Sequence, residues 1–312
     1  MKFESEQFRM TAGVADGFTT GGPVAFFIPN VDSTRRSVTP EGEVQRGEFP
    51  RPGHGDLAGA KKWQLTDATP VIEMASARIT AAYTLAGAIC QMLLNELGIS
   101  SLAHVVEVGS VKTRRRKWRR GVRLAQYVES AEASPLLCLN PGGEARMLDA
   151  IAAASEAGDT LGGLFEIVVA PVRPGLGAPQ PLSRRLDGIL AGVLMSVPGV
   201  KAAASGRGLE AHRISGRGLH DEILPGAGGE ELRGSNNAGG VEGGMSNGEP
   251  LVLRAIVKPS ASLKDPLQSV SLLDGRRGTG ARVRGDVCVA AAAAVVARAM
   301  TAHALADEVL LS

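Results

Sequence analysis

Helix-like and strand-like segments alternate along this chain without a regular period. This mixture restricts the chain to folds that combine helices and strands. Apolar residues recur at helical spacing in several stretches, and short apolar runs between turn residues are typical of strands. No repeat occurs at the spacing of solenoid proteins. We therefore expect one α+β domain over residues 1–312, with antiparallel sheets flanked by helices. The predicted helices cover residues 76–97, 144–157, 182–196 and 290–310, and the predicted strands cover residues 23–29, 102–108, 164–169 and 251–257.

The core of such a domain has to be built mainly from aliphatic side chains, because aromatic residues are only 4% of the sequence while hydrophobic residues are 44%. The apolar run at residues 287–297 is too short to cross a bilayer, and residues 1–10 are polar and charged. We therefore expect a soluble, cytoplasmic protein with no membrane partner. The net charge of +2 is too small to indicate a nucleic-acid partner.

The three cysteines, Cys90, Cys138 and Cys288, are far apart in the sequence and do not have the spacing of metal ligands. An odd number of isolated cysteines is typical of reduced thiols in a cytosolic protein. We therefore expect buried free thiols and no metal site.

The segment Arg51–Asp56, with the sequence RPGHGD, is the first candidate for chemistry. It lies in a long polar stretch, residues 33–62, which we expect to be a loop. Histidine titrates near neutral pH, so His54 is a candidate for proton transfer. The alternative is an ordinary solvated loop histidine.

Two further segments have residues suited to binding an anion. The stretch at residues 234–248, which includes Gly243, is so rich in glycine that its backbone N–H groups could approach a ligand closely. Lys258 leaves a predicted strand and is followed by the hydroxyls of Ser260 and Ser262, which could hold a phosphate. A flexible surface loop and a plain strand-end turn are the respective alternatives.

Two charged segments complete the candidates. Asp286, after Arg284 and just before the last predicted helix, is either a helix N-cap or a base at a helix start. In the run at residues 114–120 every residue except Trp118 is Arg or Lys. Such a run attracts phosphates or nucleic acid, or it is a solvated basic loop.

The order of these segments along the chain resembles chorismate synthases. The resemblance runs from about residue 10 to the C-terminus, and the RPGH and SNNAGG…GGMSNGEP blocks are the most specific to that family. The matching blocks are RPGHGDLAGAKKW, EMASARITAA, GDTLGG, PGLGAP, LMSVPGVKA, SNNAGGVEGGMSNGEPLVLRA, KPSASL and RGDVC.

The resemblance implies a single-domain β-α-β sandwich and a defined reaction. The family eliminates phosphate from 5-enolpyruvylshikimate 3-phosphate in a 1,4-elimination that gives chorismate, the last common step toward aromatic amino acids. The reaction requires reduced FMN although it has no net redox change, and the protein supplies position and charge. The resemblance also implies a homotetramer and a source of reduced flavin, which can be a separate NADP-linked flavin reductase.

The resemblance also implies roles for individual residues. His54 matches the histidine that stabilises the anionic reduced flavin, and Asp286 matches the aspartate near flavin N5 that assists proton removal. Ser76 and Arg78 match a segment lining the flavin and substrate site, with Arg78 on the substrate. The other implied flavin contacts are Pro198, Gly199, Gly243, Lys258, Pro259, Ser260, Ala261, Ser262 and Arg284.

The sequence departs from the family pattern at several points. The family opens with a Gly-Glu-Ser-His-Gly motif, and none of the five histidines lies in such a motif. Thr69 and Met74 stand where the family usually has Arg, Ile79 where it has Glu, and Gly55 where it has Ala. Each lost charge-assisted contact to a substrate anion would cost about 1.5–3 kcal/mol.

Three interpretations fit this sequence. The chain is a working chorismate synthase whose start codon was placed too late, or a divergent or truncated copy that keeps the fold and flavin binding but is catalytically impaired. The remote alternative is a nucleic-acid-binding protein that uses the basic run at residues 114–120.

Overall fold

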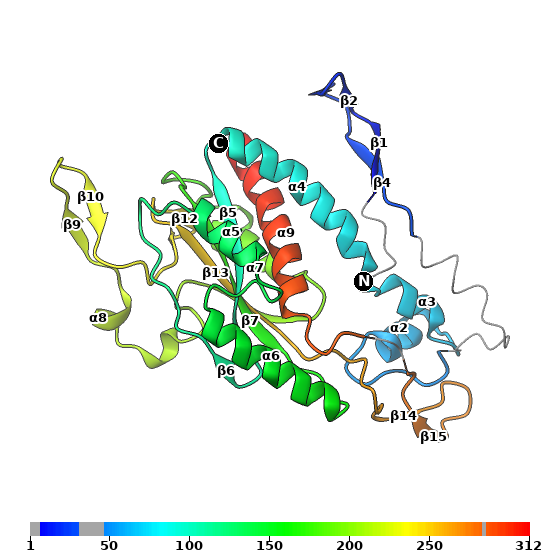
Figure 1. The fold of residues 1–312 in the computed structure, drawn as a ribbon. Coiled ribbons are helices and arrows are strands. Elements are labelled where there is room, and N and C mark those ends of the chain that lie inside the picture. The colour runs from blue at the N-terminus through cyan, green and yellow to red at the C-terminus, as the bar shows by residue number, and fades with distance from the viewer. Residues whose placement is uncertain (1–6, 31–46, 283–284) are drawn as a thin grey trace.

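The computed structural model describes residues 7–30, 47–282 and 285–312. Its centre is a five-stranded antiparallel sheet in the order β6-β5-β7-β13-β8 (Figure 1). Short strand pairs surround this sheet: β1 with β4, β2 with β3, β9 with β10, β11 with β12, and β14 with β15. The strands of the central sheet are β5 (Ser100–Val108), β6 (Val111–Lys112), β7 (Gly163–Ala170), β8 (Val200–Ser205) and β13 (Leu251–Val257). The strands of the short pairs are β1 (Arg9–Ala12), β2 (Val14–Ala15), β3 (Phe18–Thr19), β4 (Ala25–Phe27), β9 (Ile223–Pro225), β10 (Glu231–Arg233), β11 (Val241–Glu242), β12 (Met245–Ser246), β14 (Gln268–Val270) and β15 (Arg277–Thr279).

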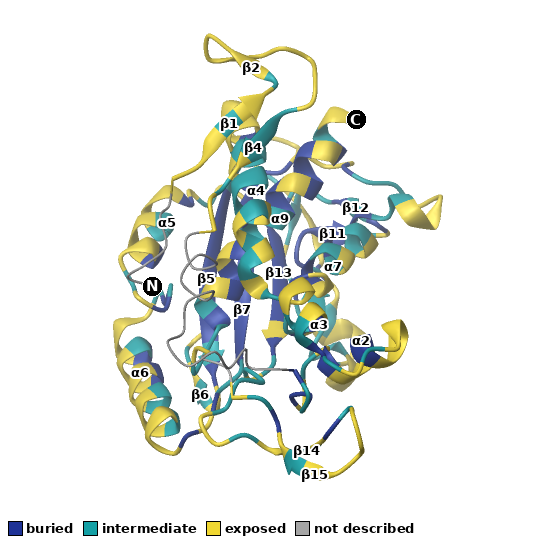
Figure 2. Cartoon of the chain, turned by 90° about the vertical axis from the view of Figure 1, so that its right-hand side faces the viewer, coloured by how far each residue is buried: buried dark blue, intermediate teal, exposed yellow. Residues whose placement is uncertain are grey.

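Helices cover one face of the sheet and flank its β5–β6 edge (Figure 2). The long helices α4 and α9 pack along each other, and α9 and α7 lie against the sheet on one face (Figure 1). Helices α5 and α6 lie along the β5–β6 edge of the sheet, with their outward faces exposed (Figure 2). The α-helices are α2 (Asp56–Trp63), α3 (Thr69–Met74), α4 (Thr80–Glu96), α5 (Ala125–Glu132), α6 (Pro141–Glu156), α7 (Leu186–Met195), α8 (Gly216–Leu219) and α9 (Ala290–Leu310), and the 3-10 helices are η1 (Ala77–Ile79), η2 (Leu182–Arg184) and η3 (Ala211–Arg213).

The main core lies between the sheet and the layer of α4, α7 and α9. Phe165 and Ile167 of β7 and Leu253 of β13 are buried there against the alanine-rich helix α9. The helices approach closely because α4 has a glycine at the crossing: a Cβ on Gly87 would lie 2.2 Å from the backbone oxygen of Ala299. A core poor in aromatic residues is thus filled by aliphatic side chains and close helix packing.

The opposite face of the sheet is partly polar. Leu102, Val168 and Val252 form a small apolar cluster with Trp118. Between these residues, His104 of β5, Glu166 of β7 and Arg254 of β13 are buried in one cross-strand row. This face meets the chain segment that follows β6.

The structure confirms the α+β class and the predicted regular elements, with some corrections. Every predicted helix and strand forms near its expected position, and residues 171–181 contain no helix or named strand. Residues 56–63, expected in a loop, are helix α2, since LAGAKKW after Asp56 has good helix formers. The strand at residues 25–27 forms but is not buried, with Phe27 54% exposed. Asp286 does not cap α9, because the N-cap is Val289.

One helical stretch, Thr69–Glu96, is long and apolar enough to cross a membrane by length and composition alone. It comprises α3, η1 and α4 and is interrupted at residues 75–76. Only 11% of its apolar window is buried, although α4 packs against α9, and a single stretch of this kind carries little weight. The stretch is therefore weak evidence for a membrane span.

The predicted free thiols are confirmed, although they differ in burial. Cys138 is buried, while Cys90 and Cys288 are partly exposed. Burial raises the pKa of all three thiols above the usual value, so they are protonated near neutral pH. Within the described ranges, no group of three or more His, Cys, Asp or Glu is arranged to hold a metal ion.

Candidate active site

The RPGHGD segment forms a tight polar cluster at the start of α2. Asp56 is the first residue of the helix and has no exposed surface, and Arg51 is only 6% exposed. The Arg51 guanidinium donates to both carboxylate oxygens of Asp56, from Nε at 2.8 Å and from Nη2 at 3.1 Å. The backbone N–H of Arg51 also donates to Asp56, at 3.0 Å. A two-point bond of this kind fixes both planar groups.

His54 is oriented by the same carboxylate. Its Nδ1 lies 2.5 Å from Asp56 Oδ1 and 3.0 Å from Arg51 Nη2. Burial alone would raise the pKa of Asp56, but the hydrogen bonds from His54 and Arg51 outweigh it and hold that pKa far below its usual range. Asp56 is therefore an acceptor at all ordinary pH values, Nδ1 carries a proton toward it, and Nε2 is the ring nitrogen left for a ligand.

The KPSAS segment, expected to bind an anion, lies directly against this cluster. It follows the last strand residue of β13, and the Lys258 ammonium donates to the backbone oxygen of Gly53. The Arg51 Nη1 group lies 3.4 Å from the Ser262 hydroxyl. The loop at residues 51–56 and the end of β13, far apart in sequence, are thus joined at one place, near α2 and the β14–β15 pair in Figure 1.

Between these two segments lies a cavity of about 250 Å³. Lys258 and Arg51 both line it, and burial together with the positive charges of Lys201 and Arg51 lowers the pKa of Lys258. A lysine disfavoured in its charged form by neighbouring cations gains from an anion beside it. The cavity is lined by Arg51, Pro52, Gly53, Asp159, Thr160, Lys258, Pro259, Ser260, Ala261, Leu263, Pro266, Leu267, Gly280 and Ala281.

Most of the other predicted site residues lie near this cavity. Gly199 accepts a 3.0 Å bond from the backbone N–H of Lys258, which places the end of α7 beside the cavity. Gly285 packs closely on Ser262, since a Cβ added to Gly285 would lie 2.6 Å from the Cβ of Ser262. The next residue, Asp286, is exposed. Pro198 precedes Gly199, while Arg284 lies outside the described residues.

Ser76 and Arg78 lie beside the histidine loop. A Cβ on Gly55 would lie 3.8 Å from the Cβ of Ala75, the residue before Ser76. The Ser76 hydroxyl accepts from the backbone N–H of Arg78 at the start of η1. The predicted substrate-side segment therefore adjoins His54 on the side of α2 and α3.

Gly243 is separated from the rest. It lies at the turn of the β11–β12 pair, where its backbone oxygen faces Arg185, the residue before α7, at 3.3 Å. Gly199 follows the opposite end of α7, and a helix of that length spans about 15 Å. Within a single chain, Gly243 therefore does not lie at the cavity beside Lys258.

The comparisons with known proteins agree with each other. The sequence profile described as Chorismate synthase matches residues 1–310. The chain is 41% identical over 316 residues to the chorismate synthase of Moorella thermoacetica, an alignment covering 99% of this chain and 81% of that protein. It is 39% identical over 315 residues to that of Caldicellulosiruptor saccharolyticus, covering 99% and 82%. The chain belongs to the chorismate synthase family.

The fold comparison supports the same family. A crystal structure of chorismate synthase superposes with a TM-score of 0.77 and 33% identity, over 97% of this chain and 78% of that one. The predicted resemblance is confirmed, and it extends from the expected residue 10 to residue 1. The chain spans about four fifths of the length of these relatives.

Three residues of this candidate site are not singled out by the sequence pattern. Arg51 and Asp56 flank His54 in the RPGHGD segment, and they form the buried ion pair that orients it. The signal was present, because a carboxylate two residues after a histidine and an arginine three before it can meet in a tight loop. Thr160, which lines the cavity and donates to the backbone oxygen of Ser260 at 2.8 Å, had no distinguishing pattern.

The family departures lie at the edge of the site. The Thr69 hydroxyl donates to Asp67 at 2.7 Å and accepts from Gly47, so it closes the loop before α3. Met74 is 59% exposed and Ile79 is 48% exposed. None of these three side chains lines the cavity at Lys258.

Proposed function

We propose that this chain catalyses the 1,4-elimination of phosphate from 5-enolpyruvylshikimate 3-phosphate to give chorismate, with reduced FMN as cofactor. The observation that carries this proposal is the meeting of the His54–Asp56 pair with the cationic KPSAS segment in a member of the chorismate synthase family. The substrate of this reaction carries a phosphate and two carboxylates, and FMN carries a phosphate. Both therefore require the positive charge that Arg51 and Lys258 provide.

The residues present suit a flavin nucleotide. Lys258 and Ser260 provide one cation and one hydroxyl in the cavity, and the Ser262 hydroxyl lies beside it, 3.4 Å from Arg51 Nη1, which suits contacts to a phosphate. Bound reduced FMN would supply the electron density that eases loss of the substrate phosphate. The cavity of about 250 Å³ is smaller than typical cofactor pockets, so it would hold part of the nucleotide.

His54 is the group proposed to stabilise the negative charge that develops on the cofactor. Asp56 fixes the Nδ1 proton and leaves Nε2 as the other ring nitrogen, in a side chain that is 23% exposed. Protonated there, Nε2 donates to an anion, and the buried carboxylate stabilises the resulting imidazolium. The exposed Asp286 is the proposed acceptor of the substrate proton, and Arg78 is the proposed contact for a substrate carboxylate.

The position of Gly243 supports assembly from several copies of the chain. Gly243 and the cavity at Lys258 lie at opposite ends of α7, about 15 Å apart along the helix, and Gly243 does not line that cavity. We infer that Gly243 contacts the flavin of a neighbouring chain, as a homotetramer would allow. The chain is proposed to work in the cytoplasm, with reduced flavin supplied by a separate, NADP-linked reductase.

Lys258→Met tests the cofactor part of this proposal. Reduced FMN is titrated anaerobically into wild type and variant, and flavin absorbance and fluorescence report binding. We expect Lys258→Met to weaken binding about tenfold or more, the effect of one charge-assisted contact. Lys264→Met, which removes an exposed lysine outside the cavity lining, is the matched control and should bind normally. Equal affinities for wild type and Lys258→Met would contradict the assignment.

A further inference from the structure

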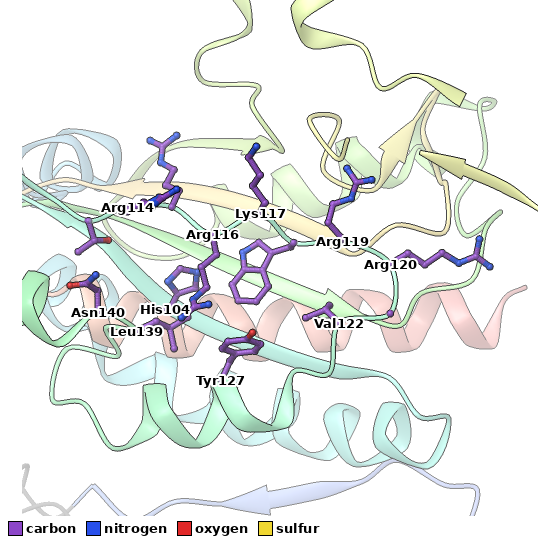
Figure 3. Close-up of a pocket in the computed structure, with 14 residues that line it drawn as sticks. His104, Arg114, Arg116, Lys117, Arg119, Arg120, Val122, Tyr127, Leu139 and Asn140 are labelled. Carbon is purple, nitrogen blue, oxygen red and sulfur yellow. The ribbon is translucent and has the colours of Figure 1, made fainter. Parts of the chain in front are cut away.

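The basic run at residues 114–120, which the proposed function does not use, encloses a second and larger cavity. The run follows β6 without helix or strand and crosses the polar face of the central sheet (Figure 3). The cavity beneath it has a volume of about 670 Å³, and His104, Trp118, Tyr127 and Asn140 line it together with the whole basic run. This volume is typical of small-molecule sites.

The basic side chains divide into those with a carboxylate partner and those without one. Arg115 is paired with Glu107 and Glu210, and Arg119 lies 3.9 Å from Glu249. Arg114 and Lys117 are exposed and make no hydrogen bond or ion pair with the part of the chain that the structure describes. The cavity rim therefore carries positive charge that the protein itself does not neutralise.

Aromatic residues form the wall of the cavity on the side of α5. Trp118 meets Tyr127 edge to face at a ring distance of 5.2 Å, and the Arg116 guanidinium lies 4.9 Å from the Tyr127 ring centre. In Figure 3, Trp118 points toward Tyr127, whereas Lys117 and Arg119 point to the opposite side of the run. The stacked arginine keeps its N–H donors available, because a cation–π contact occupies only its face.

His104 lines the cavity, and behind it lies a buried charged row that does not cancel the charge of the rim. Glu166 is fully buried and lies 3.3 Å from His104 Nε2 and 3.1 Å from Arg254 Nε. Burial would raise the pKa of Glu166, but His104 and Arg254 outweigh it and lower that pKa, so the carboxylate is ionised and already compensated. Trp118 is 4% exposed, and its indole N–H has no acceptor among the described residues. A buried donor without an acceptor indicates a missing partner.

We propose that this cavity is a second binding site, for a small polyanion carrying at least two phosphate groups. The unpartnered cations of the rim and the small-molecule volume fit such a ligand, and the indole N–H lies on the other side of the run, toward Tyr127 (Figure 3). A nucleic-acid strand fits less well, because base stacking needs exposed rings and Trp118 is buried. The site is distinct from the cavity at Lys258, with which it shares no lining residue.

Inorganic pyrophosphate is the probe for this proposal, and Trp118 is a built-in reporter. The chain has two tryptophans, so a Trp63→Phe background leaves Trp118 as the only tryptophan in the full chain. We expect pyrophosphate to change Trp118 fluorescence and to bind measurably by calorimetry. Arg114→Ala combined with Lys117→Ala should weaken this binding at least tenfold. Arg146→Ala is the matched control, since Arg146 is an exposed cation on α6 that does not line the cavity.

The outcomes separate the proposal from its alternatives. Saturable binding that the double variant weakens and Arg146→Ala leaves intact supports the site. Binding that all variants retain, or no binding of pyrophosphate, overturns it. A parallel titration with a single-stranded oligothymidylate tests the macromolecular alternative. Oligonucleotide binding far tighter than pyrophosphate binding, and lost in the double variant, would replace the small polyanion with nucleic acid. Neither titration depends on turnover, so the proposed catalytic function can fail independently.

Discussion

His54 Nδ1 lies 2.5 Å from Asp56 Oδ1, and this contact makes a fully buried carboxylate the group that orients the candidate catalytic histidine. If His54 acts on developing charge, His54→Ala should lower turnover by about 10²–10⁴-fold. Asp56→Asn should lower it about 10–100-fold, because the ring loses its fixed proton position. The double variant should be little worse than His54→Ala, since both act through one group. Steady-state turnover of the three variants measures this, and multiplicative losses would show that Asp56 acts independently.

The same pair predicts that the free energy of unfolding decreases as the pH becomes acidic. Asp56 has a lowered pKa in the fold, so its stabilising effect is complete above the unfolded-state pKa of about 3.9 and declines as pH falls below it. Asp56→Asn removes that effect and leaves Arg51 buried without its anion, which costs about 3–5 kcal/mol near neutral pH. The difference in the free energy of unfolding between wild type and variant should narrow below about pH 4, by up to about 1.4 kcal/mol per pH unit. Denaturant unfolding from pH 7 to pH 3 measures it, and a constant difference would contradict the assignment.

Much of the fold could be predicted from the sequence because its helices and strands have clear apolar periods. The Ala-rich segment Ala290–Leu310 is helical over its expected range, and β7 has Phe165, Ile167 and Val169 on one face as expected. Helix α2 was missed because its eight residues have only a weak apolar face and follow a Gly- and Pro-rich loop. Short segments of this kind are fixed by tertiary contacts more than by their own pattern.

Two glycines of the RPGHGD loop should respond oppositely to alanine. Gly53 has φ +80°, where a side chain is strained, so Gly53→Ala should lower the free energy of unfolding by about 1–2 kcal/mol. Gly55 has φ −74°, and a Cβ there would meet Ala75 at an ordinary 3.8 Å. Gly55→Ala should therefore raise stability by about 0.4–1 kcal/mol through the unfolded state. Denaturant unfolding of both variants checks this, and shifts of the same sign would show that the loop conformation is assigned wrongly.

The crossing of α4 and α9 predicts a second pair of opposite effects. Gly87→Ala would place a Cβ 2.2 Å from the Ala299 oxygen, so the helices must separate, at a cost of about 1–3 kcal/mol. Gly192→Ala, in the exposed interior of α7 with no atom within 4 Å, should instead gain up to about 1 kcal/mol of helix propensity. Thermal unfolding distinguishes the two. A neutral Gly87→Ala would mean that the two helices do not pack this closely.

The site was less predictable than the fold for a physical reason. The sequence identifies residue types such as His54 and Lys258, but their meeting depends on a contact between the loop at residues 51–56 and the end of β13 that no local pattern encodes. The same limit explains Gly243, which matched the family by sequence yet lies at the far end of α7 within one chain. Arg51 and Asp56 are identified as parts of the site by their burial and by the two hydrogen bonds that join them.

Anaerobic incubation of this chain with 5-enolpyruvylshikimate 3-phosphate and chemically reduced FMN tests whether the chain forms chorismate. Chorismate absorbance and phosphate release are followed together, with oxidised FMN and the His54→Ala variant as controls. We predict equal amounts of chorismate and phosphate, many per chain, with reduced FMN only, and a loss of at least about a hundredfold in His54→Ala. Retained FMN binding without chorismate formation would contradict the proposed function and leave a flavin-binding member of the family that has lost its activity.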